Sequence, residues 1–371
     1  MRIKDFTLER YFARWEFTAP YLLCSSDTES FAMAELIEMA DDDARARWAG
    51  LRLGYTEAPG LPALREAISS LYEKIAADEI IVFAGAEEAI FAFAQSAFQP
   101  GDHVVALWPA YQSLHEAARA AGADVEPLRL RYEDGWRLDL ELLTSMLRPS
   151  TRAIIVNFPH NPTGMLPSRA EFDALAKLCA SRGITLFCDE VYRFGEFDEA
   201  DRLENAADAF EGGVSLGGLA KPFGLAGLRI GWIATRDVRL RARIASFKDY
   251  LTICSSAPSE ILALVALRAK VRVLGRNRAI VATNLAKLDE FFARHSQLVE
   301  WVRPRAGSIG FPRLLTGEPV DAFAERCVTQ TGVLILPGSI FDHAGDHFRI
   351  GFGRKNMPEV LDRFEAFLTT P

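Results

Sequence analysis

The chain has 371 residues and a formal net charge of −8, and hydrophobic and charged residues make up 49% and 25% of it. This balance is typical of a globular protein, and the length predicts two or three domains, or one large α/β domain with a smaller partner. The negative charge and the lack of a Lys/Arg block argue against nucleic acid or an anionic membrane as the main partner. Small anionic ligands are compatible with it, because a single pocket can be basic on an acidic protein.

Hydropathy and cysteine usage predict a cytoplasmic protein without a membrane span. The N-terminal stretch MRIKDFTLERYF lacks the apolar region of a signal peptide. The most apolar window, Ile80 to Phe98, carries Glu87 and Glu88 in its middle, which argues against a transmembrane helix. Five scattered cysteines without a CxxC pair or a nearby histidine predict reduced thiols, and neither a disulfide scaffold nor a metal site.

Short apolar runs alternate with amphipathic segments between about residues 61 and 235. The predicted strands are Ile80–Phe83, His103–Leu107, Asp124–Leu128, Ala153–Asn157, Ile184–Cys188, Gly213–Leu216 and Ile230–Ala234. The predicted helices are Leu61–Ala76, Ala86–Phe98, Leu114–Ala121, Leu138–Leu147 and Ser168–Ser181. This alternation predicts an α/β fold whose mostly parallel sheet is covered by helices on both faces and binds ligands at the carboxyl ends of its strands.

The two terminal parts of the chain depart from this pattern. Residues 1–48 look irregular, while a long helical region from Arg236 to about His295 precedes strands at Val299–Arg303 and Val333–Ile335 and a last helix from Pro358. We therefore predict a large ligand-binding domain over residues 49–255. The segments 1–48 and 256–371 are expected to form a smaller domain together.

Three clusters of polar residues and glycines each follow a predicted strand: NFPHNPTG (157–164), FCDEVYRFG (187–195) and SLGGLAKPFGLAGLRIGW (215–232). In the third, glycines surround Lys221, which can form a Schiff base with a carbonyl, and Arg229, which suits a phosphate. In the second, Asp189 follows an apolar strand, where a buried carboxylate needs a cation such as a protonated pyridine nitrogen. The first places Asn161 before a proline in a rigid turn. Each cluster alone could be an ordinary turn, but together they indicate one ligand.

With these three clusters in this order, the chain resembles the class I/II aminotransferases of fold type I, which use pyridoxal 5′-phosphate (PLP). The resemblance covers nearly everything from Tyr55 to Arg349. It implies a large domain in α/β/α layers and a smaller α+β domain. It also implies that Lys221 carries the cofactor as a Schiff base and moves the substrate proton, while Asp189 pairs with the pyridine nitrogen. Asn161 and Tyr192 would bond the ring oxygen.

The same resemblance assigns the remaining contacts of cofactor and substrate. Tyr111 would stack on the pyridine ring, and Tyr55 would reach the phosphate bound by a neighbouring subunit, which implies a homodimer with shared sites. The phosphate would be bound by Arg229 and by the turn Gly85-Ala86-Glu87 at a helix N-terminus. Many relatives have a phosphate-binding serine at the position of Gly218; either Ser215 replaces it or this contact is missing. The substrate would be bound by Asn161, Ser26 and Arg349, with Arg349 gripping the α-carboxylate.

Two reactions are compatible with these residues. The first is transamination between an L-amino acid and a 2-oxo acid. The second is suggested by segments 24–36, 247–252 and 332–341, which resemble those of capreomycidine synthases, enzymes that use the same lysine for elimination at Cβ and cyclisation of a hydroxyarginine. Both begin with deprotonation at Cα, so the motifs do not separate them. A ligand-sensing DNA-binding regulator is disfavoured, because the PLP-domain pattern begins near residue 50 after a short acidic stretch.

Overall fold

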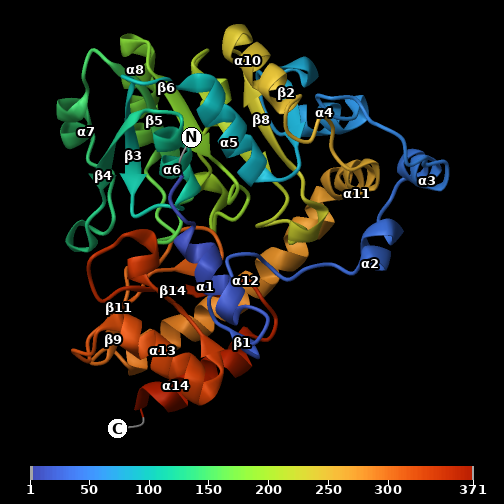
Figure 1. Cartoon of the computed structure of the whole chain (residues 1–371). Coiled ribbons are helices and arrows are strands. Elements are labelled where there is room, and N and C mark those ends of the chain that lie inside the picture. The colour runs from blue at the N-terminus through green and yellow to red at the C-terminus, as the bar shows by residue number, and fades with distance from the viewer. Residues whose placement is uncertain (1–2, 370–371) are drawn as a thin grey trace.

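The structure is a computed structural model that describes residues 3–369. Figure 1 shows two parts, one built around a large sheet and one, at the bottom of the view, formed by the C-terminal segment together with α1 and β1 from the N-terminus. Within the described residues, no helix is both long and apolar enough to cross a membrane. The five cysteines are free thiols.

The large part contains a seven-stranded sheet in the order β2-β8-β7-β6-β5-β3-β4. All seven predicted strands are confirmed, and their bounds are β2 Ile80–Phe83, β3 His103–Trp108, β4 Asp124–Arg129, β5 Thr151–Asn157, β6 Thr185–Asp189, β7 Gly213–Gly218 and β8 Gly231–Thr235. Strand β8 runs in the opposite direction to the other six strands of this sheet. The sheet is therefore mostly parallel, as the alternating pattern predicts.

Helices cover both faces of this sheet because successive strand residues point to opposite sides. One face packs on α5 (Ala86–Ala97), α6 (Ser113–Ala120) and α10 (Val238–Lys248). The other packs on α4 (Pro62–Ser69), α7 (Leu140–Met146), α8 (Arg169–Arg182), α9 (Ala206–Ala209) and α11 (Ala257–Arg268). Near-continuous apolar strands are what such double coverage requires.

The second part combines segments from both ends of the chain. Strand β1 (Tyr21–Leu22) pairs in parallel with β12 (Val333–Leu334), which confirms that the N-terminal segment joins the C-terminal one. The other strands are β9 (Val299–Glu300), β10 (Ile309–Gly310), β11 (Arg313–Leu314), β13 (Leu336–Pro337) and β14 (Phe348–Gly351). They pack with α12 (Lys270–Arg294), α13 (Val320–Thr331) and α14 (Met357–Thr369).

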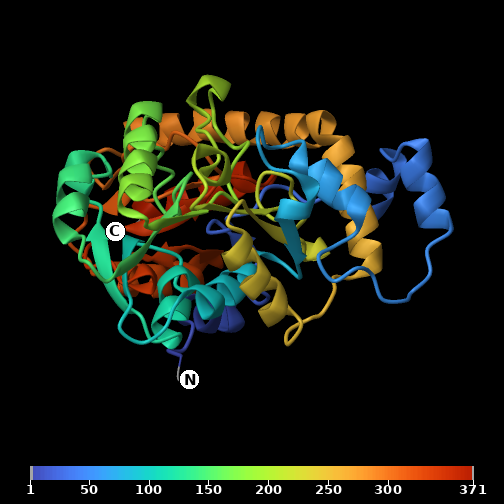
Figure 2. The ribbon, with the colours of Figure 1, turned by 90° about the horizontal axis from the view of Figure 1, so that it is seen from above.

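Several helices near the junction of the two parts pack with the large part, although some of them belong to segments predicted to form the smaller one. Helices α2 (Met33–Glu38) and α3 (Asp42–Ala49) contact α11, and α11 shares a core with β2 and β8, so all three pack with the large part. Helix α1 (Thr7–Trp15) buries Leu8 in a core with β3 and β5. The long α12 runs along one side of the molecule and is the long orange helix in Figure 2. The domain limits at residues 48 and 255 stay a prediction.

Candidate active site

The carboxyl ends of β5, β6 and β7 meet at one cavity of about 180 Å³. Asn161 follows β5, Asp189 is the last residue of β6, and Lys221 comes after β7 ends at Gly218. All three side chains line the cavity, because β5, β6 and β7 are parallel neighbours and end at the same edge of the sheet. The three sequence clusters are thus brought together at one place.

Asp189 is a buried carboxylate to which no cationic side chain of residues 3–369 is bonded. It is 4% exposed, and its Oδ1 accepts a hydrogen bond from the backbone N–H of Val191 at 3.1 Å. Burial raises the pKa of this carboxyl to about 7, although the charge of Lys221 acts in the opposite direction. A cation placed in the cavity would supply the missing partner and favour the ionised form.

Lys221 and Tyr192 present their polar atoms to the same cavity. Lys221 Nζ donates a hydrogen bond to Ser26 Oγ at 2.7 Å and lies 5.7 Å from the centre of the Tyr192 ring. The hydroxyl of Tyr192 is buried and has no hydrogen-bond partner among residues 3–369. A buried hydroxyl left unpaired costs about 1–3 kcal/mol, so a ligand oxygen at this position would be stabilised.

A cradle for an anion lies where α5 begins. Gly85 precedes the helix with a φ of 94°, in the left-handed region that favours glycine. A Cβ at this position would come within 2.4 Å of Nη2 of Arg229, so the guanidinium lies directly against the glycine. The free N–H groups at Ala86 and beyond, the helix dipole and the guanidinium all favour a negative charge here.

Glu87 lies in this cradle but is held towards α6. Its Oε2 accepts a hydrogen bond from Ser113 Oγ at 3.0 Å, and burial raises the pKa of its carboxyl to about 7. The acidic side chain is therefore tied to Ser113, and its burial favours the neutral form. Both effects reduce its repulsion of an anion bound at the cradle.

Arg349 is buried, with 1% of its surface exposed. Its Nη1 donates to Asn161 Oδ1 at 3.1 Å and its Nη2 to the carbonyl oxygen of Cys24 at 2.9 Å, while its Nε has no partner. None of the ion pairs within residues 3–369 involves Arg349. A buried guanidinium with neutral partners and a free donor is suited to bind a carboxylate.

Helix α1 forms one wall of the cavity, a role that was not predicted for this segment. Leu8, Glu9 and Phe12 line the cavity beside Tyr111, whose ring centre lies 5.2 Å from that of Phe6. The apolar residues at positions 8, 11, 12 and 15 have helical spacing and could have predicted the helix. Its position over the cavity depends on contacts with distant residues, which no local pattern reveals.

Two predicted site residues lie elsewhere. Ser215 is fully buried within β7, where its hydroxyl donates to Glu190 Oε1 at 2.7 Å and accepts from the N–H of Ala207, so the structure corrects its placement at the phosphate. Gly218 lines the cavity instead. Tyr55 is 90% exposed and does not line the cavity of its own chain. A role for Tyr55 in a partner's site stays a prediction.

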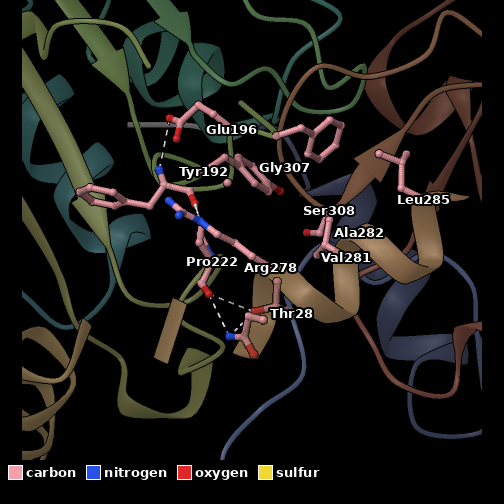
Figure 3. A pocket seen from close by; sticks show the side chains of 14 residues that line it. Thr28, Tyr192, Glu196, Pro222, Arg278, Val281, Ala282, Leu285, Gly307 and Ser308 are labelled. Carbon is pink, nitrogen blue, oxygen red and sulfur yellow. Dashed lines mark hydrogen bonds between the residues drawn. The ribbon is translucent and has the colours of Figure 1, made fainter. Parts of the chain in front are cut away.

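A second, separate cavity of about 160 Å³ lies behind Tyr192 (Figure 3). Side chains from α12, among them Val281, Ala282 and Leu285, form one side of it, and Pro222 and Ser308 also line it. Tyr192 lines both cavities, but Lys221, Asp189 and Arg349 line only the first. Because it contains these three charged side chains, the first cavity is the candidate active site.

Comparison with known proteins assigns the chain to a family. Residues 21–364 match the family described as aminotransferase class I and II. The chain belongs to this family. It is 31% identical to capreomycidine synthase of Streptomyces vinaceus over 94% of this chain and 88% of that protein, and 30% identical to an arginine–pyruvate transaminase of Pseudomonas aeruginosa over 92% and 88%. A PLP-dependent aminotransferase from Streptococcus suis superposes with a TM-score of 0.93 at 29% identity, covering 99% and 98% of the two chains.

The first cavity has the donors and acceptors that pyridoxal 5′-phosphate requires. The unpaired hydroxyl of Tyr192 fits a ring oxygen, and the buried Asp189 carboxylate fits a protonated ring nitrogen. The cradle at Gly85 and Arg229 fits a phosphate, and Lys221 Nζ is the amine that can bond to an aldehyde. The family and its solved members identify this cofactor, and the Tyr192 hydroxyl and the Asp189 carboxylate are suited to bind it.

Proposed function

We propose that the protein transfers an amino group between an L-amino acid and a 2-oxo acid. The observation that carries the proposal is that Lys221, Asp189 and Arg349 all line one cavity although they come from distant parts of the chain. This reaction needs an amine for proton transfer, a carboxylate to bind a ring cation and a guanidinium to bind the substrate carboxylate. The family assignment supports the same reaction.

In this proposal each residue has a separate task. Lys221 Nζ would remove the proton from the substrate Cα and deliver one to the cofactor carbon C4′. The hydrogen bond to Ser26 orients the amine before this transfer. Asp189 holds the ring nitrogen in its protonated form. The bound cofactor supplies an electron sink that stabilises the negative charge developing at Cα.

Arg349 and Asn161 bind the substrate's α-carboxylate. The hydrogen bond from Arg349 to Asn161 and the one to the Cys24 carbonyl fix the plane of the guanidinium before substrate arrives. Preorganised donors lose little entropy on binding, and two parallel N–H groups match the two oxygens of a carboxylate. This geometry orients Cα relative to Lys221 and favours amino acids over simple amines.

We also propose a homodimer with shared active sites. Tyr55 is 90% exposed, and Leu53 and Tyr250 are 85% and 87% exposed in the single chain. Large apolar side chains left in water suggest a covered surface. The guanidinium of Arg229 also lies at the exposed side of the cavity, where a tyrosine from a second subunit would complete the phosphate site.

A second candidate is elimination at Cβ followed by ring closure. The identity of 31% to capreomycidine synthase favours it, and it needs the same proton removal by Lys221. The two candidates differ in the fate of the amino group, which is retained by the cofactor in a transamination half-reaction and stays with the product or is lost as ammonia after elimination.

A half-reaction screen separates these candidates. The purified, PLP-loaded protein is mixed with single amino acids, arginine and hydroxyarginine included, without any 2-oxo acid. Stoichiometric conversion of the cofactor to pyridoxamine phosphate, with one equivalent of 2-oxo acid formed, supports transamination. Continued turnover with the cofactor unchanged supports the lyase or cyclase. If no amino acid changes the cofactor or is consumed, both candidates fail.

A further inference from the structure

We propose that Glu9 on helix α1 selects amino acids with a cationic side chain, such as a guanidinium or an ammonium group. This inference rests on the proposed function, because it concerns the substrate of the same cavity. It starts from the charged side chains that line the cavity, which are Glu9, Glu87, Asp189, Lys221, Arg229 and Arg349.

Five of these six charged groups already have a partner or a task. Lys221, Asp189 and Arg229 face the cofactor, and Arg349 faces the α-carboxylate. Glu87 is bonded to Ser113. Glu9 has no hydrogen bond or ion pair with any residue of the range 3–369, where the ion pairs of α1 and its flanks are Lys4–Asp342 and Arg14–Glu325. Glu9 is exposed in the single chain, and its carboxylate is the charged group lining the cavity that has no partner among the described residues.

The fold holds Glu9 at a fixed place. The N–H of Thr7 donates to Gln112 Oε1 at 2.9 Å, and Gln112 Nε2 donates to the carbonyl oxygen of Asp5 at 2.8 Å. At the other side of the helix, the Tyr11 hydroxyl donates to the carbonyl oxygen of Ile335. Helix α1 is therefore tied to both parts of the molecule and lies at their junction in Figure 1. A carboxylate on a fixed helix can discriminate between substrates, because little ordering is needed on binding.

The next glutamate along this segment, Glu16, does not line the cavity. Glu16 lies two helical turns further along the same side, and the pKa of its half-buried carboxyl is raised, chiefly by burial and then by Glu9, while Arg354 and Lys221 act in the opposite direction. Arg354 is itself neutralised by a bidentate pair with Asp27 at 3.0 Å. A substrate cation in the cavity would therefore meet one carboxylate, that of Glu9, which no cationic side chain of the described range pairs.

The opposite end of the substrate is anchored independently. Arg349 is 1% exposed and has a free Nε at the same cavity. An amino acid bound with its carboxylate at Arg349 and its amino group near Lys221 extends its side chain away from both, and α1 is the wall that carries unpaired charge. Acidic side chains would be repelled there, and neutral ones would form no ion pair with Glu9.

The test compares L-arginine with L-citrulline, which has the same length and shape but an uncharged head group. In single-turnover half-reactions of the PLP-loaded protein, the wild type should prefer arginine by about tenfold or more, the factor that about 1.4 kcal/mol provides. The variant Glu9→Gln should reduce this preference to about threefold or less. Glu66→Gln, the same change at an exposed glutamate on α4 away from the cavity, should leave the preference unchanged.

A binding measurement gives a second readout that does not depend on turnover. 5-Guanidinopentanoate and 5-ureidopentanoate lack the amino group and cannot react, and their affinities for the loaded protein can be measured by calorimetry. The guanidino compound should bind more tightly to the wild type, and Glu9→Gln should remove the difference. Equal preference for arginine in wild type and Glu9→Gln, or equal affinities of the two analogues for the wild type, would overturn the inference. If neutral amino acids react well and arginine does not, the inference fails while the proposed function stands.

Discussion

Replacing Arg349 is the sharpest perturbation of the proposed substrate site. The guanidinium is buried, and its two hydrogen bonds go to the neutral acceptors Asn161 Oδ1 and the Cys24 carbonyl. Charge-assisted hydrogen bonds are worth about 1.5–3 kcal/mol each, so a carboxylate held by two of them gains about 3–6 kcal/mol. The lower bound corresponds to a loss of about 150-fold in kcat/KM for Arg349→Gln. Arg349→Lys keeps the charge but not the paired donors, so its kcat/KM should lie between those of the wild type and of Arg349→Gln.

The effect on folding should be much smaller than the effect on catalysis. Arg349→Gln leaves one or both carbonyl acceptors without a donor, at about 1 kcal/mol each, but it also removes a buried charge that has no counter-ion, and the two effects offset each other. Cofactor affinity should not change, because the phosphate cradle involves other residues. Arg326→Gln, at a partly exposed pair with Glu318 outside the cavity, serves as the control.

The assay is steady-state or single-turnover kinetics with one amino acid, alongside PLP titration and thermal unfolding. We expect the loss to appear mainly in KM, since Arg349 binds the carboxylate in the ground state as well as in the transition state. A variant with wild-type kcat/KM would refute the assignment of the carboxylate site. A variant that also loses PLP, or unfolds well below the wild type, would show that Arg349 is a structural residue.

Three further predictions follow from the same cavity. Lys221→Ala should retain the fold but lose turnover by about 10⁴-fold, since the proton-transfer group is gone. Turnover of this variant at the wild-type rate would contradict the role of Lys221. In the cofactor-free protein, burial raises the pKa of Asp189 to about 7 from an ordinary value of 3.8, so the folded state binds more protons than the unfolded state between these values. Stability should therefore fall as pH rises from about 4 to 7, and thermal unfolding should show a smaller fall in Asp189→Asn. Tyr55→Phe should weaken PLP binding by about tenfold, the effect of one hydrogen bond to a charged group, and sedimentation should show a dimer; an unchanged affinity would exclude Tyr55 from the phosphate site.

The sheet and the centre of the site could be predicted from sequence because both follow from short-range rules. Apolar runs of strand length define the parallel strands, and parallel neighbours end at the same edge, which brings Asn161, Asp189 and Lys221 together. Ser215 was misplaced by the same local reasoning. It lies within β7, as the predicted strand Gly213–Leu216 already implied, and the alternation of side chains along the strand directs its hydroxyl to Glu190 and not into the cavity.

The N-terminal wall could not be predicted, because it depends on contacts between residues far apart in the chain. The bond between Thr7 and Gln112 spans 105 positions, and the one between Tyr11 and Ile335 spans 324. The guanidinium of Arg349 likewise meets Cys24 across 325 positions. Such contacts are set by how the two parts pack, which the periodicity of either segment does not specify.

These long-range contacts also place the two recognition elements for the substrate on different parts of the molecule. Lys221 and Asp189 belong to the large part, Arg349 lies on β14 of the smaller part, and Glu9 lies on the helix tied to both. A small shift between the parts would move Arg349 and Glu9 relative to Lys221, and would therefore change binding and proton transfer together. Substitution of Gln112 by alanine tests this coupling, because it releases α1 without removing any charged group from the cavity. It should lower the preference for arginine over citrulline while leaving PLP affinity unchanged; if the preference persists, Glu9 is positioned by other contacts of α1.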